Sequence, residues 1–156
     1  MARTMISSGG MKTVLPVYLI DTNVISELRK RDKTDHGVTA FIAEAKGAEA
    51  PCYLSVITLG ELRRGIEMIH HRGDTKQANA MTDWYTGITE DFADFILPID
   101  QDVATMWALL RVPHYENALD KLIAATALIY SLKVVTRNVK DFERSGVSTI
   151  NPLTNF

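Results

Sequence analysis

Short, continuous apolar runs recur along this chain, and they constrain its fold more than any other feature. The runs predict strands at about residues 14–20, 52–56 and 95–99, and two shorter stretches of mixed character predict strands at 133–136 and 147–150. A continuous apolar run indicates a strand that is buried on both faces, as in a parallel sheet. The segments between the runs carry apolar residues at helical spacing. This alternation predicts an α/β fold in which right-handed crossovers place helices on both faces of a parallel sheet.

Length and composition indicate a single domain. The 156 residues, 46% of them hydrophobic and 23% charged, suffice for one core. We expect the domain at residues 13–156, after a flexible tail at residues 1–12. The apolar runs are far shorter than a membrane span, and the segment before Asp21 lacks a small-residue cleavage site. With one cysteine, Cys52, an internal disulfide is impossible, so we expect a cytoplasmic protein without membrane association.

Asp21 follows the first of these runs, where apolar residues give way to Asp21, Thr22 and Asn23 and a helical pattern begins. Ligands of open parallel sheets bind just beyond the carboxyl ends of the strands, which is where Asp21 would lie. A structural alternative is that Asp21 and Thr22 cap the helix, because acids and hydroxyls are common N-caps. The position alone is compatible with both roles.

Three further acids, Glu61, Asp120 and Asp141, share with Asp21 a predicted position in the first turn of a helix. Each has a structural explanation; Glu61, for example, has capping-box spacing from Thr58. Most of these helices directly follow a strand, so a parallel sheet would collect the acids at one edge. Converging carboxylates either take up protons or require a cation, and Mg²⁺ prefers such oxygen ligands.

Other kinds of site find little support in the sequence. It has neither a cysteine and histidine cluster that would indicate zinc nor the phosphate-binding motifs GxxxxGK[ST] and GxGxxG. A phosphorelay receiver domain would need two acids after the first strand, an aspartate after the third and a lysine after the last. Asp100 meets the second requirement, but Asp21 is a single acid and no lysine follows the last strand. Asn23 disfavours a phosphatase of the DxDxT kind. A non-catalytic nucleic-acid-binding or regulatory module, whose acids are only helix caps, remains an alternative.

Four segments together resemble the motifs of PIN-domain ribonucleases, and most closely the VapC-type toxins of bacterial toxin–antitoxin pairs. The segments are residues 19–23, 58–65, 120–127 and 136–142, and the closing Asn151 and Pro152 also fit. The resemblance extends over residues 17–152 and implies a PIN-like three-layer sandwich with a parallel five-stranded sheet flanked by helices. It also implies cleavage of RNA that depends on Mg²⁺ or Mn²⁺.

The resemblance assigns roles to the residues that match these motifs. The matching residues are Asp21, Glu61, Asp120 and Asp141 as catalytic acids, and Thr22 and Asn138 as supporting polar groups. Asp21 and Asp120 would bind the metal directly. The chain departs from the family at residues 111–117, where the approach to Asp120 is shorter than usual.

Arginines near the acidic edge are candidates for binding RNA phosphates, foremost Arg63 and Arg137. Solvated surface charge or a local salt bridge explains each of them equally well. The formal net charge of −2 provides no global basic field, so any attraction would be local. Single-stranded RNA is favoured over a duplex because its bases can splay into a site.

Two helical segments carry more apolar residues than a small sheet needs for cover, which predicts association. These residues are Met81, Trp84, Tyr85 and Ile88 in the segment 75–91, and Met106, Trp107 and Leu110 in the segment 101–112. The family resemblance implies a homodimer and a cognate antitoxin that inserts a basic side chain toward the acids. It also implies that operator DNA is bound only through the antitoxin.

Overall fold

The computed structural model describes residues 5–8 and 11–153. A five-stranded parallel sheet in the order β5-β4-β3-β6-β7 forms its centre. The strands are β3 (Tyr18–Ile20), β4 (Cys52–Ser55), β5 (Ile96–Leu97), β6 (Lys133–Val135) and β7 (Thr149–Ile150). Each strand lies within one of the five predicted strands and is shorter than it or equal to part of it, so the predicted parallel sheet is confirmed.

Successive side chains of the central strands enter two separate cores, because alternate residues of a strand point to opposite faces. Leu19 of β3 and Val134 of β6 pack into one core, and Ile20 and Val135 pack into the other. All four side chains are fully buried. A strand without a solvent-exposed face needs no polar alternation, which explains the continuous apolar runs.

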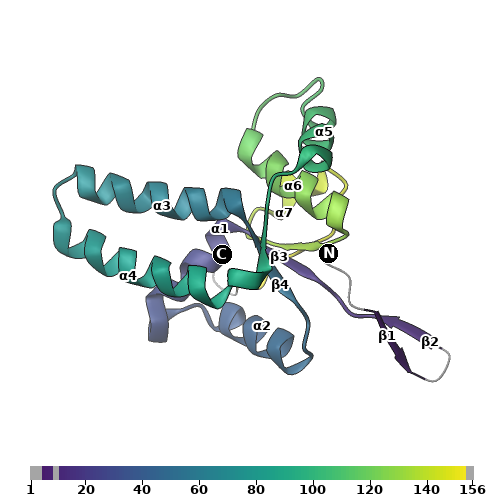
Figure 1. The fold of residues 1–156 in the computed structure, drawn as a ribbon, viewed down its shortest axis with the longest axis horizontal. Coiled ribbons are helices and arrows are strands. Elements are labelled where there is room, and N and C mark those ends of the chain that lie inside the picture. The colour runs from purple at the N-terminus through teal and green to yellow at the C-terminus, as the bar shows by residue number, and fades with distance from the viewer. Residues whose placement is uncertain (1–4, 9–10, 154–156) are drawn as a thin grey trace.

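Helices cover both faces of the sheet (Figure 1). The first core is closed by residues of α5 (Gln101–Leu110), α6 (Ala118–Tyr130) and α7 (Val139–Glu143). The second core is closed by α1 (Thr22–Ile25), α2 (His36–Gly47), α3 (Val56–His71) and α4 (Thr75–Asp91). The 3-10 helix η1 (Ser26–Lys33) connects α1 to α2, and η2 (Ala93–Phe95) follows α4. The three-layer α/β fold is therefore confirmed. None of the described helices has the length and apolar character needed to cross a membrane.

Helices α3 and α4 form a long antiparallel hairpin that extends away from the sheet (Figure 1). Ile66 and Ala78 are buried in this hairpin although they lie far from the sheet, because the two helices cover each other. Nearer the sheet, Ile88 is buried and Trp84 and Tyr85 pack against the core. Most of the apolar stripe of α4 is therefore covered at least in part by the core, which leaves less of it available for association than the sequence predicted.

The segment that was expected to be a flexible tail, residues 1–12, contains regular structure where it is described. An antiparallel hairpin is formed by β1 (Met5–Ser8) and β2 (Met11–Val14), and it points away from the body in Figure 1. Residues 1–4 and 9–10 lie outside the described residues. The first strand of the main sheet begins at Tyr18 rather than at residue 14, because Pro16 has no N–H to donate to a ladder.

Candidate active site

The strand order of the sheet reverses at the carboxyl ends of β3 and β6, and we call this edge of the sheet the crevice. From β3 the chain proceeds to β4 and β5 on one side, and it then returns to β6 on the other side of β3. Such a reversal of strand order is where open parallel sheets bind ligands. Asp21 follows β3 and Thr136 follows β6, and the Asp21 N–H donates to the Val135 carbonyl at 2.9 Å. The sheet itself therefore fixes the backbone of Asp21.

The Asp21 carboxylate is oriented by three hydrogen bonds. Its Oδ1 accepts the Thr22 N–H at 2.8 Å, and its Oδ2 accepts the Thr136 hydroxyl at 2.8 Å and the Asn23 side-chain amide at 3.2 Å. Only 4% of the residue is exposed. Asp21 also occupies the N-cap position of α1, as the structural alternative predicted.

Burial dominates the electrostatics of Asp21. It is the main reason why the pKa of this carboxyl is raised to about 6, and the charges of Asp120 and Glu61 contribute in the same direction. The hydrogen bonds from Thr136 and Thr22 oppose this rise. The three acids therefore share one electrostatic environment although they are far apart in the sequence.

Glu61 reaches this crevice from the second turn of α3, so its predicted capping-box role is wrong. The helix begins at Val56, earlier than predicted, because the Ser55 side chain accepts the Ile57 N–H at 3.1 Å and caps it. The Glu61 Oε1 instead accepts the Thr22 hydroxyl at 2.8 Å. Thr22 thus connects the two strand ends, since its backbone binds Asp21 and its side chain binds Glu61.

Asp120 and Asp141 lie together at the opposite side of the crevice. Both occupy the first turn of a helix, as predicted, with Asp120 on α6 and Asp141 on α7. The pKa of Asp120 is raised, first by burial and then by the charges of Asp141 and Glu61. Both acids line a pocket of about 410 Å³, whose other lining residues include Leu110, His114, Glu116, Lys121 and Arg144.

Thr136 and Asn23 are site residues to which sequence reasoning gave no role. Besides donating to Asp21, the Thr136 Oγ1 accepts the Asn138 N–H at 2.9 Å, and the Asn23 Oδ1 accepts the Arg137 N–H at 3.1 Å. Asn138, given a supporting role by the resemblance, occupies the N-cap position of α7, although its side chain makes no capping bond. The available signal was the position of Thr136 directly after a buried strand, in the same relation as Asp21 to β3.

The two arginines predicted to bind RNA differ in their surroundings. Arg63 lies on α3 and pairs with the exposed Glu67 at 2.6 Å. Arg137 is exposed and follows Thr136, so its backbone belongs to the crevice. The structure places the backbone of Arg137 beside Asn23, whereas Arg63 has the local salt bridge that was its alternative explanation.

The donor set of the crevice suits a hard divalent cation. Among the described residues, no three histidine, cysteine or acidic side chains are close enough together to hold a metal ion by themselves. Mg²⁺ does not need such a cluster, because it keeps several waters and uses one or two carboxylates. Asp21 and Asp120 would bind a cation through oxygen atoms only. The cation would offset the neighbouring acidic charges that help to raise the pKa values of both residues.

The sequence matches known proteins over most of its length. The PIN domain family matches residues 18–146. Toxin FitB of Neisseria gonorrhoeae is 36% identical over 87% of this chain and 98% of its own length. VapC ribonuclease Y4jK of Sinorhizobium fredii is 34% identical over 87% of this chain and 97% of its own length.

Solved structures agree with these matches. The crystal structure of FitAcB from Neisseria gonorrhoeae aligns with a TM-score of 0.74 at 34% identity, over 87% of this chain and 98% of that one. A toxin–antitoxin complex from Klebsiella pneumoniae aligns with a TM-score of 0.55 at 26% identity, over 86% of this chain and 97% of that one. The chain therefore belongs to the PIN domain family, and within it is a homologue of the FitB and VapC toxins.

Proposed function

We propose that this chain is a metal-dependent endoribonuclease, the toxin of a toxin–antitoxin pair, which hydrolyses RNA phosphodiester bonds in the crevice. The observation that carries the proposal is the state of Asp21. It is a buried carboxylate at the reversal point of the sheet, and it is coupled by charge to Glu61 and Asp120. A residue that only caps a helix needs neither to be buried nor to lie near other acids.

In this proposal Asp21 and Asp120 hold the metal ion, with Glu61 and Asp141 completing the catalytic acids. A bound Mg²⁺ or Mn²⁺ would lower the pKa of a water and offset the charge of the scissile phosphate. A carboxylate has about four acceptor positions. Within the described part of the chain, the donors to Asp21 occupy both positions of Oδ2 and one of Oδ1, which leaves acceptor capacity that a metal ion could use.

The chain's own polar groups keep these acids in place before substrate arrives. Thr136 and Asn23 fix the Oδ2 side of Asp21, and the Thr22 hydroxyl holds Glu61. Asn138 supports the site through its backbone, whose N–H donates to Thr136. Such preorganisation reduces the rearrangement needed when charge develops on the phosphate.

The test is cleavage of single-stranded cellular RNA by purified protein with Mg²⁺, with Mn²⁺ and with a chelator. We expect cleavage with either metal, none with chelator, and none by Asp120→Asn, which keeps the side-chain shape. RNA that stays intact with metal, while a related active toxin cuts it, would contradict the proposal. Metal-independent RNA binding without cleavage would instead identify the non-catalytic module that the sequence left open.

We also propose that the protein acts in the cytoplasm as a homodimer and that a cognate antitoxin blocks the crevice with a basic side chain. Operator DNA is then contacted only through the antitoxin. The support for association now lies around the α5–α6 loop, where large apolar side chains are exposed. They are Leu109, Val112, Tyr115 and Leu119, with exposed fractions of 66%, 77%, 75% and 47%. Sedimentation that shows only monomer at micromolar concentration would remove the dimer from the proposal.

A further inference from the structure

The pocket beside Asp120 and Asp141 has a wall that the proposed chemistry does not use. This wall is the loop 111–117 between α5 and α6, together with the end of α7. It contributes His114 and Glu116 from the loop and Arg144 from just beyond α7. The volume of about 410 Å³ is in the range of pockets that take small organic ligands. The pocket therefore has room for a substrate group next to the acids.

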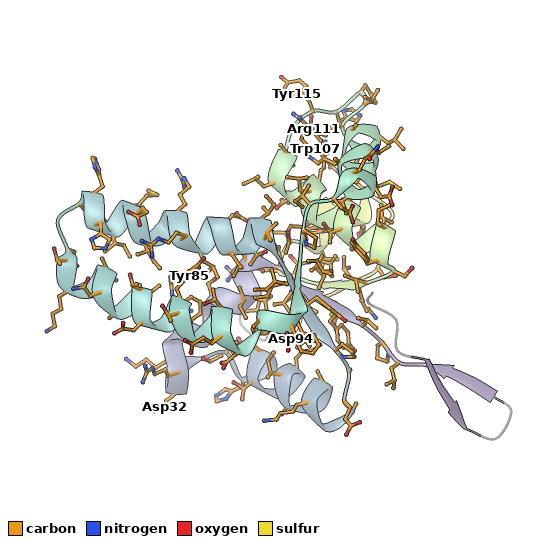
Figure 2. All side chains as sticks on the ribbon, in the orientation of Figure 1. Asp32, Tyr85, Asp94, Trp107, Arg111 and Tyr115 are labelled. Atoms are coloured by element: carbon orange, nitrogen blue, oxygen red, sulfur yellow. The ribbon has the colours of Figure 1, made fainter. Side chains whose placement is uncertain are left out.

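The loop is held by two side chains, Arg111 at its start and Lys121 of α6. The Arg111 guanidinium lies 4.6 Å from the centre of the Trp107 ring, and its Nε and Nη2 both donate to the Tyr115 carbonyl, at 3.1 and 2.8 Å. Lys121 Nζ donates to the His114 carbonyl. Figure 2 shows Trp107, Arg111 and Tyr115 one above another, with Tyr115 at the outer end. The backbone of His114 is thus held while its side chain stays 76% exposed.

The pocket contains two cationic side chains that could contact a phosphate, Lys121 and Arg144, beside its acids. The pKa of Glu116 is lowered, first by a hydrogen bond from its own N–H and further by positive charges around it. Those charges belong to Lys121, His114 and Arg144. In the described part of the chain the Arg144 guanidinium has neither an ion pair nor a hydrogen-bond acceptor, unlike Arg63 and Arg111. An unpaired guanidinium beside acids counteracts their repulsion of a phosphate.

We propose that this pocket is a nucleotide subsite for the single-stranded RNA strand, adjacent to the scissile bond. Arg144 contacts a phosphate, and the His114 imidazole stacks on the attached base. The inference rests on the proposed function, because it places RNA across the same acids. It adds a division of roles, since phosphate contacts position the strand whereas base contacts select its sequence.

The test separates these roles by measuring RNA binding without cleavage. The affinity of short single-stranded oligoribonucleotides of different sequence is measured by fluorescence anisotropy, with chelator present and at several salt concentrations. Arg144→Gln should weaken every oligonucleotide equally, by about tenfold, and should reduce the salt slope by about 0.7. His114→Ala should weaken binding by at least about fivefold and should change the ranking of the sequences.

The matched controls are Arg72→Gln and His70→Ala, the same substitutions at exposed positions near the outer end of α3. Both should bind like the wild type. If the Arg144 and His114 variants match these controls, or if the wild type does not bind, the subsite is wrong. If the two variants weaken only the cognate antitoxin, the pocket is a protein-binding surface, and the proposal is equally wrong.

Cleavage assays distinguish this failure from failure of the proposed function. With Mg²⁺ present, Arg144→Gln should raise KM for single-stranded RNA while kcat is retained. If the wild type cuts RNA and Arg144→Gln changes neither KM nor the cut sites, the subsite is wrong and the nuclease proposal stands. Wild-type protein that binds RNA through Arg144 and His114 but never cuts it overturns only the nuclease proposal.

Discussion

At two strand-to-helix junctions of this chain an aspartate caps the helix, but the pKa values of the two aspartates are shifted in opposite directions. Asp21 ends β3 and caps α1, while Asp100 follows β5 and caps α5, where it accepts the Val103 N–H at 2.9 Å. The pKa of Asp21 is raised to about 6, mainly by burial. The pKa of Asp100 is lowered, mainly by the hydrogen bond from the Tyr130 hydroxyl.

The difference comes from the positions of the two strands in the sheet. β5 is an edge strand, whereas β3 is the central strand, at the point where the strand order reverses. Asp100 therefore has donors around it, while Asp21 has other acids in its electrostatic environment. The same residue at the same kind of junction is a structural cap in one place and a candidate metal ligand in the other.

The strongest way to break this comparison is to substitute both aspartates with asparagine, which is also a good N-cap. Asp21→Asn should reduce RNA cleavage by more than about 100-fold. This exceeds the roughly 10- to 100-fold loss that is usual when a residue hydrogen-bonded to a metal ligand is replaced. Asp100→Asn should leave cleavage near the wild-type level. The measurement is the initial rate of cleavage at saturating Mg²⁺ for the three proteins.

Melting curves extend this test to metal binding. Mg²⁺ at about 100 times its dissociation constant should stabilise the wild type by roughly 2.7 kcal/mol, and Asp100→Asn should respond equally. Asp21→Asn should lose most of that response, and it should melt higher than the wild type in chelator because a buried charge is removed. An unchanged Mg²⁺ response in Asp21→Asn would show that Asp21 is not a ligand.

Stability should depend on pH with opposite signs at the two junctions. The folded protein holds the Asp21 proton more tightly than the unfolded chain, so this contribution to stability is full below about pH 4 and is lost as pH rises to about 6. It amounts to roughly 3 kcal/mol in the metal-free protein, at 1.36 kcal/mol per pKa unit. The lowered pKa of Asp100 acts oppositely, stabilising above its ordinary pKa and losing that contribution as pH falls.

Urea denaturation in chelator between pH 4 and 7 measures these contributions. The free energy of unfolding of Asp21→Asn minus that of the wild type should grow across this range. The same difference for Asp100→Asn should not grow. A constant difference for Asp21→Asn would mean that its carboxyl is not perturbed by burial.

The next effect in size concerns Thr136, whose hydroxyl donates to Asp21 as the Tyr130 hydroxyl donates to Asp100. Thr136→Val keeps the side-chain shape but removes the donor to Asp21 and the acceptor for the Asn138 N–H. We expect cleavage to fall by about 10- to 100-fold and stability to fall by about 1–3 kcal/mol. Thr126→Val is the matched control, because it removes a buried hydroxyl whose bond goes to the Leu122 carbonyl of its own helix. If both variants lose cleavage equally, Thr136 has no special role.

The smallest effects should distinguish the two arginines predicted from the sequence. Arg137→Gln should reduce the salt slope of single-stranded RNA binding by about 0.7, the value for one phosphate contact. Arg63→Gln should reduce it less, because Arg63 is paired with Glu67. Neither substitution should change stability by more than about 0.5 kcal/mol, since both residues are exposed. A larger slope change for Arg63 than for Arg137 would reverse the assignment.

The sheet was predictable because its strands are buried on both faces, which leaves continuous apolar runs in the sequence. The third run forms an edge strand, the position in which a sheet tolerates a residue such as Pro98 that lacks an N–H. Helix α4 coincides with the segment 75–91 that was predicted to be helical. The resemblance supplied the fold family, and the family and structure matches confirm it.

Contacts between distant residues were beyond sequence reasoning. The bond from Thr136 to Asp21 joins positions separated by 115 residues, and it exists only because β3 pairs with β6. Glu61 was placed too early in its helix because the competing cap, Ser55, lay within a predicted strand. The wall around His114 depends on the Arg111 and Lys121 side chains bonding to backbone carbonyls, which no motif encodes.

The pairing of β3 with β6 has a consequence for the timing of synthesis. Asp21 is among the first residues of the domain to leave the ribosome, yet its N–H bonds to Val135 and its carboxylate to Thr136. At about 5–20 residues per second, several seconds pass before those partners are made. The nascent chain therefore has no assembled crevice until β6 and Thr136 have emerged. The order of the strands delays assembly of the proposed active site until long after Asp21 is made.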